Sequence, residues 1–167
     1  MELAEFQRFL QFLTERQPNK KPMPEEQVQL ICAQFPHRKM PALVLAYLRT
    51  CGAWIAAGCS EAWCGVIEDG KFQDYGEFIR EDDYADEEFR KYGFAYEDCF
   101  FFLDSQELMY VFVYLDGERD DPLVYTFWEI GGDPRPEPVL FSQWFIDNYN
   151  RWVPEEEQWR GSAGADR

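Results

Sequence analysis

Three consecutive apolar runs in the middle of the chain constrain its fold more than any other feature. They cover Cys99–Leu103, Met109–Leu115 and Leu123–Trp128, and all three are rich in aromatic and β-branched residues. Turn-forming residues separate the runs, with Gly117 and Pro122 in the longer connection. Short runs of this composition bounded by turns are typical of antiparallel strands. We therefore predict that these three segments pair as neighbours in one sheet.

Helical periodicity precedes the strands. Over residues 2–14, apolar side chains recur every three or four positions, as on one face of a helix. This wide stripe suits a helix held between other elements, with a partner-binding helix as the alternative. A second helix is expected to begin at Pro24 and to bury Val28, Ile31, Cys32 and Phe35. A third is expected from Pro41 to Gly52.

The remaining elements are shorter. Trp54-Ile55 and Trp63–Ile67 are candidate strands, and a short helix around Tyr84–Tyr92 should turn Phe89 and Tyr92 inward. Near the end, Ser142 is expected to cap a closing helix, with Phe141 and Ile146 as a hydrophobic staple.

The order of these elements predicts an α+β fold. Helices come first, strands follow and a helix closes the chain, so we expect a central, mainly antiparallel sheet flanked by N-terminal helices and a closing C-terminal helix. The length of 167 residues suits one domain, which we place at residues 1–153. Residues 154–167 are predicted to form a polar tail that is mobile at least past Trp159.

Negative charge is the main compositional feature. The chain has 32 acidic and 16 basic residues, and the stretch from Glu68 to Asp121 carries 13 of the 16 excess negative charges. Solubility is one explanation, and a surface that binds a basic protein is the other. Direct binding of nucleic acid is disfavoured because phosphate neutralisation needs clustered Lys and Arg.

Two groups of acidic residues are the candidate partner-binding surface. The first lies at the centre of the acidic segment (residues 68–92), and the second lies in the connection between the second and third central strands. The candidate residues are Asp82, Asp83, Asp86, Glu87, Glu88, Asp116, Glu118, Asp120 and Asp121.

Sequence patterns for catalysis, metal binding or cofactor binding are weak. The acidic segment lacks the spacing of a calcium loop, and closely spaced solvated acids generally keep ordinary pKa values. His37, the only histidine, lies in a linker, and Cys59 and Cys64 lack zinc-site spacing. Gly131-Gly132 is not followed by a phosphate-binding motif. We therefore predict a non-enzymatic protein without a cofactor or metal.

The five cysteines are best explained as free thiols. They are odd in number and irregularly spaced, and no export signal or membrane-spanning run is evident in the sequence. A reducing cytoplasm is therefore the expected location, and no membrane partner is expected.

The order of several motifs resembles the SMI1/KNR4 family, also called the SUKH superfamily. Gly93–Asp98 before the first central strand and Asp121–Tyr125 at the third look like the family's centre. Met40–Ala53 resembles its helix that starts at Leu-Pro and ends at Asn-Gly, although Cys51 replaces the Asn. Phe141–Phe145 resembles its closing helix, so the resemblance covers residues 40–150.

The resemblance implies two functions. Bacterial members of the superfamily include immunity proteins that neutralise a cognate toxin, often a nuclease, whose basic substrate-binding surface an acidic surface can occupy. Resemblance to the fungal members of the superfamily implies that the protein is an intracellular adaptor or scaffold instead. An acidic nucleic-acid mimic is a third hypothesis, and the oligomeric state is left open. A toxin gene immediately upstream would favour the immunity function, and an isolated locus would favour the adaptor.

Overall fold

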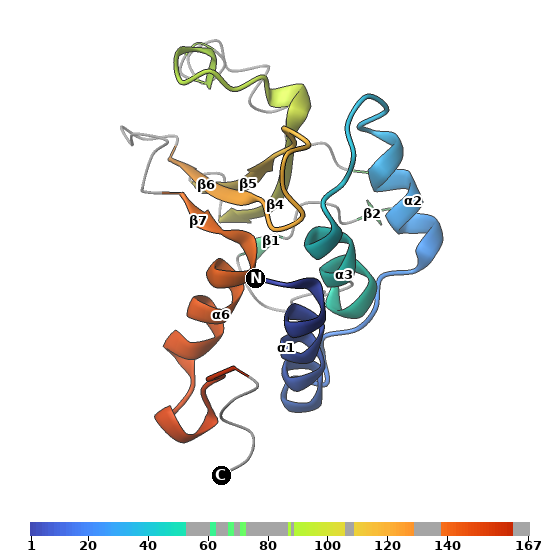
Figure 1. Ribbon diagram of the computed structural model, residues 1–167. Helices are drawn as coiled ribbons and strands as arrows, with labels where there is room; N and C mark the ends of the chain where they lie inside the picture. The colour runs from blue at the N-terminus through green and yellow to red at the C-terminus, as the bar shows by residue number, and fades with distance from the viewer. Residues whose placement is uncertain are drawn as a thin grey trace.

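The computed structural model has an α+β fold in which helices lie against an antiparallel sheet (Figure 1). It describes residues 1–52, 61–62, 67–68, 71–72, 87, 89–105, 109–128 and 138–161. The helices are α1 (Leu3–Arg16), α2 (Glu25–Ala33), α3 (Ala42–Cys51) and α6 (Phe141–Trp152), with 3-10 turns η1 (Tyr96–Asp98) and η2 (Glu155–Glu157). The strands are β1 (Glu61–Ala62), β2 (Ile67–Glu68), β3 (Lys71–Phe72), β4 (Cys99–Ser105), β5 (Met109–Tyr114), β6 (Leu123–Trp128) and β7 (Val139–Leu140).

The three predicted central strands are neighbours in the sheet, so this prediction is confirmed. The strand order is β1-β4-β5-β6-β7, every described pairing is antiparallel, and β2 and β3 form a separate two-stranded sheet. Phe101 pairs with Phe112, which in turn pairs with Tyr125. The candidate strand Trp54-Ile55 and most of Trp63–Ile67 lie outside the described residues.

Successive side chains of a strand point to opposite faces of the sheet, and in this sheet both faces carry apolar side chains. One face carries Phe100, Phe102, Val111, Val113 and Val124, which belong to the larger core with the helices. The other face carries Phe101 and Phe112, which belong to a second, smaller core. Both faces are therefore covered, which explains why the central strands are almost continuously apolar rather than alternately polar.

Helices α1, α3 and α6 cover the first face (Figure 1). Phe141, at the start of α6, lies at their meeting point. Its ring is 5.9 Å from Phe6 of α1, 6.0 Å from Tyr47 of α3 and 5.5 Å from Phe102 of β4. The wide apolar stripe of the first helix is thus used for packing, because Phe6, Phe9, Leu10 and Leu13 are all buried.

The end of the acidic segment covers the second face. Glu87 and residues 89–91 are helical, and the Phe89 ring is fully buried at 5.1 Å from Phe112. Phe94 packs 4.8 Å from Tyr125, and Tyr92 contacts the same core. The inward orientation predicted for Phe89 and Tyr92 is confirmed. Figure 1 shows this part of the chain on the opposite side of the sheet from α6.

Two predicted details of α2 need correction. Pro24 precedes the helix as its N-cap instead of occupying the first helical position. Cys32 and Phe35 are only half-buried, whereas Val28 and Ile31 are buried as predicted. The bidentate pair between Arg49 of α3 and Glu25 of α2, at 2.9 and 2.7 Å, adds a polar contact between these helices.

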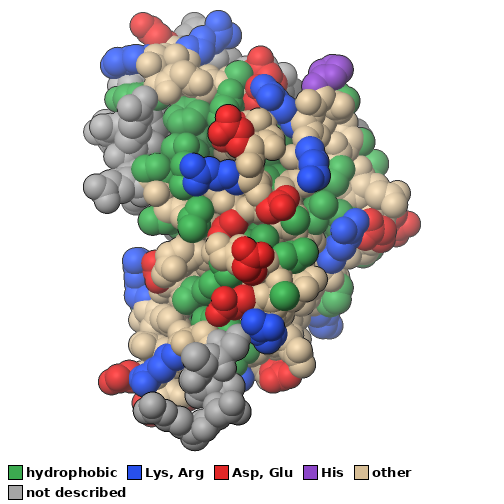
Figure 2. Space-filling model, viewed as in Figure 1, with side chains coloured by type: hydrophobic (Ala, Val, Ile, Leu, Met, Phe, Trp, Pro, Cys, Tyr) green, Lys and Arg blue, Asp and Glu red, His purple; other side chains and the backbone are tan. Residues whose placement is uncertain are grey.

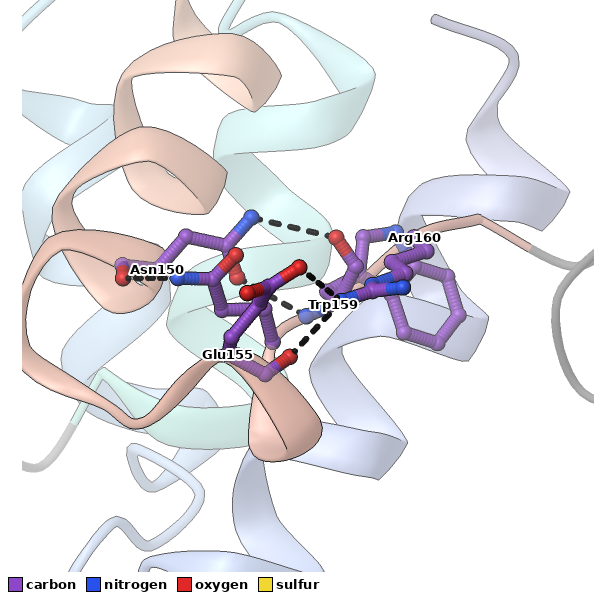
Figure 3. Close-up of polar contacts among 5 residues, drawn as sticks. Asn150, Glu155, Trp159 and Arg160 are labelled. Atoms are coloured by element: carbon purple, nitrogen blue, oxygen red, sulfur yellow. Dashed lines mark hydrogen bonds and ion pairs between the residues drawn. The ribbon is translucent and has the colours of Figure 1, made fainter.

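The expected domain boundary at residue 153 is too early. Residues 153–160, which we call the C-terminal hook, fold back onto α1 and α6. The Trp159 ring packs 5.7 Å from Phe9 and 5.0 Å from Phe12. Figure 3 shows Asn150 exchanging two hydrogen bonds with the Trp159 backbone, at 3.1 and 2.8 Å. The packed domain therefore extends at least to Trp159, because a tryptophan supplies more apolar surface than the polar composition of the tail suggests.

Candidate functional site

The hairpin loop (residues 115–122), which joins β5 to β6, holds four of the predicted partner-binding acids. Its base is fixed by backbone hydrogen bonds to three other segments. Leu43 N–H of α3 donates to the Asp120 carbonyl at 3.1 Å, and Phe141 N–H of α6 donates to the Pro122 carbonyl at 2.8 Å. Leu115 N–H donates to the Asp98 carbonyl at 2.9 Å. The loop is therefore attached to the helix layer and to the segment before β4.

Asp121 is the buried member of this group. Its carboxylate accepts hydrogen bonds from Ser142 Oγ at 2.7 Å and Ser142 N–H at 3.0 Å, and it pairs with the Met1 ammonium at 2.6 Å. Only 9% of the residue is exposed. Because its oxygens already have close partners inside the protein, Asp121 holds the fold together instead of presenting a carboxylate to a partner.

This contact also corrects the prediction for the closing helix. Ser142 is not the N-cap, because α6 begins at Phe141 and its N-cap residue is Leu140. The carboxylate of Asp121 accepts from the free Ser142 N–H, which is the bond a local cap would make. A negative charge at this position also suits the positive end of the helix dipole. The cap is supplied by a residue 21 positions away.

The other three acids of the hairpin loop are exposed at its tip. Glu118 N–H donates to Asp116 Oδ1 at 2.9 Å, and Gly117 between them has φ of +79°, a conformation that glycine adopts without strain. Asp120 lies 3.9 Å from Lys39 Nζ, with both side chains largely exposed. Asp116, Glu118 and Asp120 are therefore exposed on one loop with a fixed base, whereas Asp121, which was predicted with them, is buried.

The acidic segment is described only in part. Glu87 is exposed, and the buried Phe89 two residues later packs its helix onto the sheet. Asp82, Asp83, Asp86 and Glu88 lie outside the described residues. On the face seen in Figure 2, acidic and basic side chains are interspersed over the middle of the molecule. Arg38 and Asp98 form a bidentate pair, and the hydrogen bonds to the carboxylate raise the pKa of Arg38.

The described thiols are poorly suited to nucleophilic chemistry. Burial raises the pKa of Cys51 to about 12 and raises that of Cys99 well above its ordinary value, so both stay protonated at neutral pH. Cys32, Cys51 and Cys99 are free thiols, as predicted, while Cys59 and Cys64 lie outside the described residues.

Groups that could hold a metal ion do not occur within the described ranges, where no three His, Cys, Asp or Glu side chains converge. Over the same residues, no helix combines the length and apolar character needed to cross a bilayer. His37 is exposed in the linker between α2 and α3.

Comparison with protein-family models, with curated proteins and with solved structures found no match for this chain. The likeness to the SMI1/KNR4 family therefore depends on the order of its motifs alone.

Proposed function

We propose that this protein is a non-enzymatic binding protein of the SMI1/KNR4 type that neutralises a basic toxin domain in the cytoplasm. The observation that carries the proposal is the hairpin loop, which presents Asp116, Glu118 and Asp120 to solvent. Its base is held by α3 and α6. A carboxylate-rich loop with a fixed base loses little conformational entropy when it binds, and its charge attracts a positively charged surface.

A nuclease is the toxin class that this charge distribution suits best. Enzymes that bind nucleic acid use Lys and Arg to neutralise phosphates. A chain with a net charge of −16 can cover such a surface by electrostatic complementarity. The acidic segment, through Asp82, Asp83, Asp86, Glu87 and Glu88, would extend the contact surface beyond the loop.

The test uses the protein partner retrieved from the source cell with the intact chain and identified by mass spectrometry. Reversing Asp116, Glu118 and Asp120 to Lys should slow association by at least about tenfold at low salt, because steering depends on the sign of the charges. The wild-type association rate should fall with added salt as the Debye length shrinks from about 10 Å at 0.1 M. A second variant reverses Asp82, Asp83, Asp86, Glu87 and Glu88.

The matched control reverses three exposed acids, the α1 N-cap residue Glu2, Glu15 of α1 and Glu26 of α2, which changes the net charge by the same amount. Association of this control should slow much less than that of the hairpin variant. Equal association rates for the hairpin variant and the wild type would show that the loop is not part of the binding surface. A partner without toxic activity would favour the adaptor function.

A further inference from the structure

Trp152 is the most exposed large apolar side chain in the described part of the molecule. It ends α6 with 81% of its surface open to solvent, compared with 46% for Leu30, the next most exposed. The other aromatic residues of α6 are buried or half-buried. Folding places this indole in water, and tryptophan is the residue type that most often dominates the energetics of protein interfaces.

The backbone on both sides of Trp152 is held in place. Before it, Tyr149 packs 6.2 Å from Phe9 and 5.6 Å from Phe12 of α1. After it, the C-terminal hook is fastened by the two bonds between Asn150 and Trp159 and by Gln158 Nε2, which donates to the Asn150 carbonyl at 3.1 Å (Figure 3). The indole therefore projects from a preorganised support, which lowers the entropic cost of binding.

Carboxylates follow the indole within five residues. Glu155, Glu156 and Glu157 are all exposed in η2. Arg160 is paired with Glu155 at 3.0 Å. Arg151 lies one helical turn after Asp147, so the charge of Asp147 offsets that of Arg151. Within the described part of the chain, Glu156 and Glu157 form no ion pair. Residues 147–160 therefore hold four acidic and two basic side chains, an excess of two negative charges. Arg16 of α1 is the further cation at this end of the protein, where it lies against the Phe12 ring.

We propose that Trp152, together with Glu156 and Glu157, forms a docking surface for an arginine-bearing segment of a partner protein. A guanidinium group stacks on an aromatic face and pairs with carboxylates, whereas a lysine ammonium is more strongly hydrated and cannot form the planar contacts. The same end of the protein already binds guanidinium groups in both ways. Arg16 lies 3.7 Å above the Phe12 ring, and Arg160 pairs with Glu155.

This surface is separate from the hairpin loop. Asp121 of the loop contacts the first turn of α6, and Trp152 is at the other end of that 12-residue helix. At 1.5 Å per residue, the two ends are about 17 Å apart. The inference therefore goes beyond the proposed function and can be tested independently of it.

The test measures binding of a fluorescent nona-arginine peptide to the full chain by anisotropy at 0.15 M salt. Trp152→Ala should weaken binding about three- to tenfold, and the pair E156Q/E157Q should weaken it by a similar factor. The matched control D116N/E118Q removes the same charge from the hairpin loop and should change the affinity less than twofold. A nona-lysine peptide should be much less sensitive to Trp152→Ala.

Urea unfolding of Trp152→Ala should give the wild-type midpoint, because the side chain is exposed, so lost binding cannot be ascribed to unfolding. The proposal is overturned if Trp152→Ala binds nona-arginine as wild type does, or if the wild type does not bind it. It is also overturned if the hairpin control loses as much affinity as E156Q/E157Q, which would indicate unspecific attraction to an acidic protein. Each result leaves the hairpin-loop experiment unaffected.

Discussion

The Asp121 carboxylate brings together segments from three parts of the chain. It contacts the Met1 ammonium, lies in the hairpin loop two residues before β6, and binds the first turn of α6. A buried carboxylate is costly unless it is paired and hydrogen-bonded, and here three donors satisfy it. The neighbouring Asp120, with 70% of its side chain exposed, uses its backbone carbonyl for the fold and leaves its carboxylate in solvent.

Asp121→Ala should destabilise the protein by about 2–4 kcal/mol, because it removes a charged acceptor and leaves Ser142 and the ammonium without their partner. Asp120→Ala is the control and should change the free energy of unfolding by less than about 0.5 kcal/mol. Urea denaturation followed by circular dichroism measures both. Similar unfolding midpoints for the two variants would contradict the role assigned to Asp121.

Cys51 makes stability sensitive to alkaline pH. Its pKa is raised from about 9 to about 12 in the folded protein, so the unfolded chain releases this proton first. The stabilising contribution of the Cys51 thiol is complete below about pH 9 and is lost as pH rises toward about 12. The urea midpoint should therefore fall between pH 9 and 11, and Cys51→Ala should make this fall shallower. Cys32→Ala, at a half-buried thiol, should change the slope less.

Contacts with residues outside α6 fix both ends of this helix. At the start, Asp121 replaces a local cap, and at the end Asn150 pairs with the backbone nine residues later. Between them, Phe141 and Phe145 pack on Tyr47 of α3 and Phe102 of β4. The helix therefore connects the sheet to the C-terminal hook.

Asn150→Ala should release the hook, because it removes both hydrogen bonds to the Trp159 backbone. We expect a loss of about 1–2 kcal/mol in stability and faster cleavage after Glu155, Glu156 or Glu157 by a glutamate-specific protease. Gln143→Ala is the control on the same helix, since Gln143 bonds only the exposed Asp147. Cleavage of Asn150→Ala at the wild-type rate would show that Trp159 packing alone retains the hook.

At the scale of the whole molecule, one antiparallel sheet separates two apolar cores. The helix layer on one side contributes the larger core. On the other side, the acidic segment contributes Phe89 and the residues after it contribute Phe94. An acidic stretch can therefore be part of the fold through its few aromatic residues while its carboxylates remain in water, as Glu87 does.

All five cysteines should titrate as thiols when the protein is purified without reductant and denatured. Cys51 and Cys99 are buried, and their raised pKa values slow oxidation in the folded protein. A reproducible count of three or one from fresh material would reveal a disulfide and contradict the proposed cytoplasmic location. In the folded protein, a thiol reagent at pH 8 should modify Cys32 before Cys51 and Cys99.

The sequence by itself determined the central sheet and the helices of the larger core. The runs at β4, β5 and β6 are short, aromatic and bounded by turns, and the stripe of α1 has helical spacing, so local pattern and final structure agree. The tip acids Asp116, Glu118 and Asp120 were also predictable, because a turn between two strands exposes its polar residues.

Only the tertiary structure decided which acid of the hairpin loop is buried and how α6 begins and ends. Asp120 and Asp121 are adjacent and chemically identical, and only the packing of α6 against the loop encloses one and leaves the other in solvent. Likewise, Trp152 and Trp159 both lie in polar sequence, yet Trp159 packs on α1 while Trp152 faces water. These differences arise from contacts between residues distant in sequence, which no local pattern encodes.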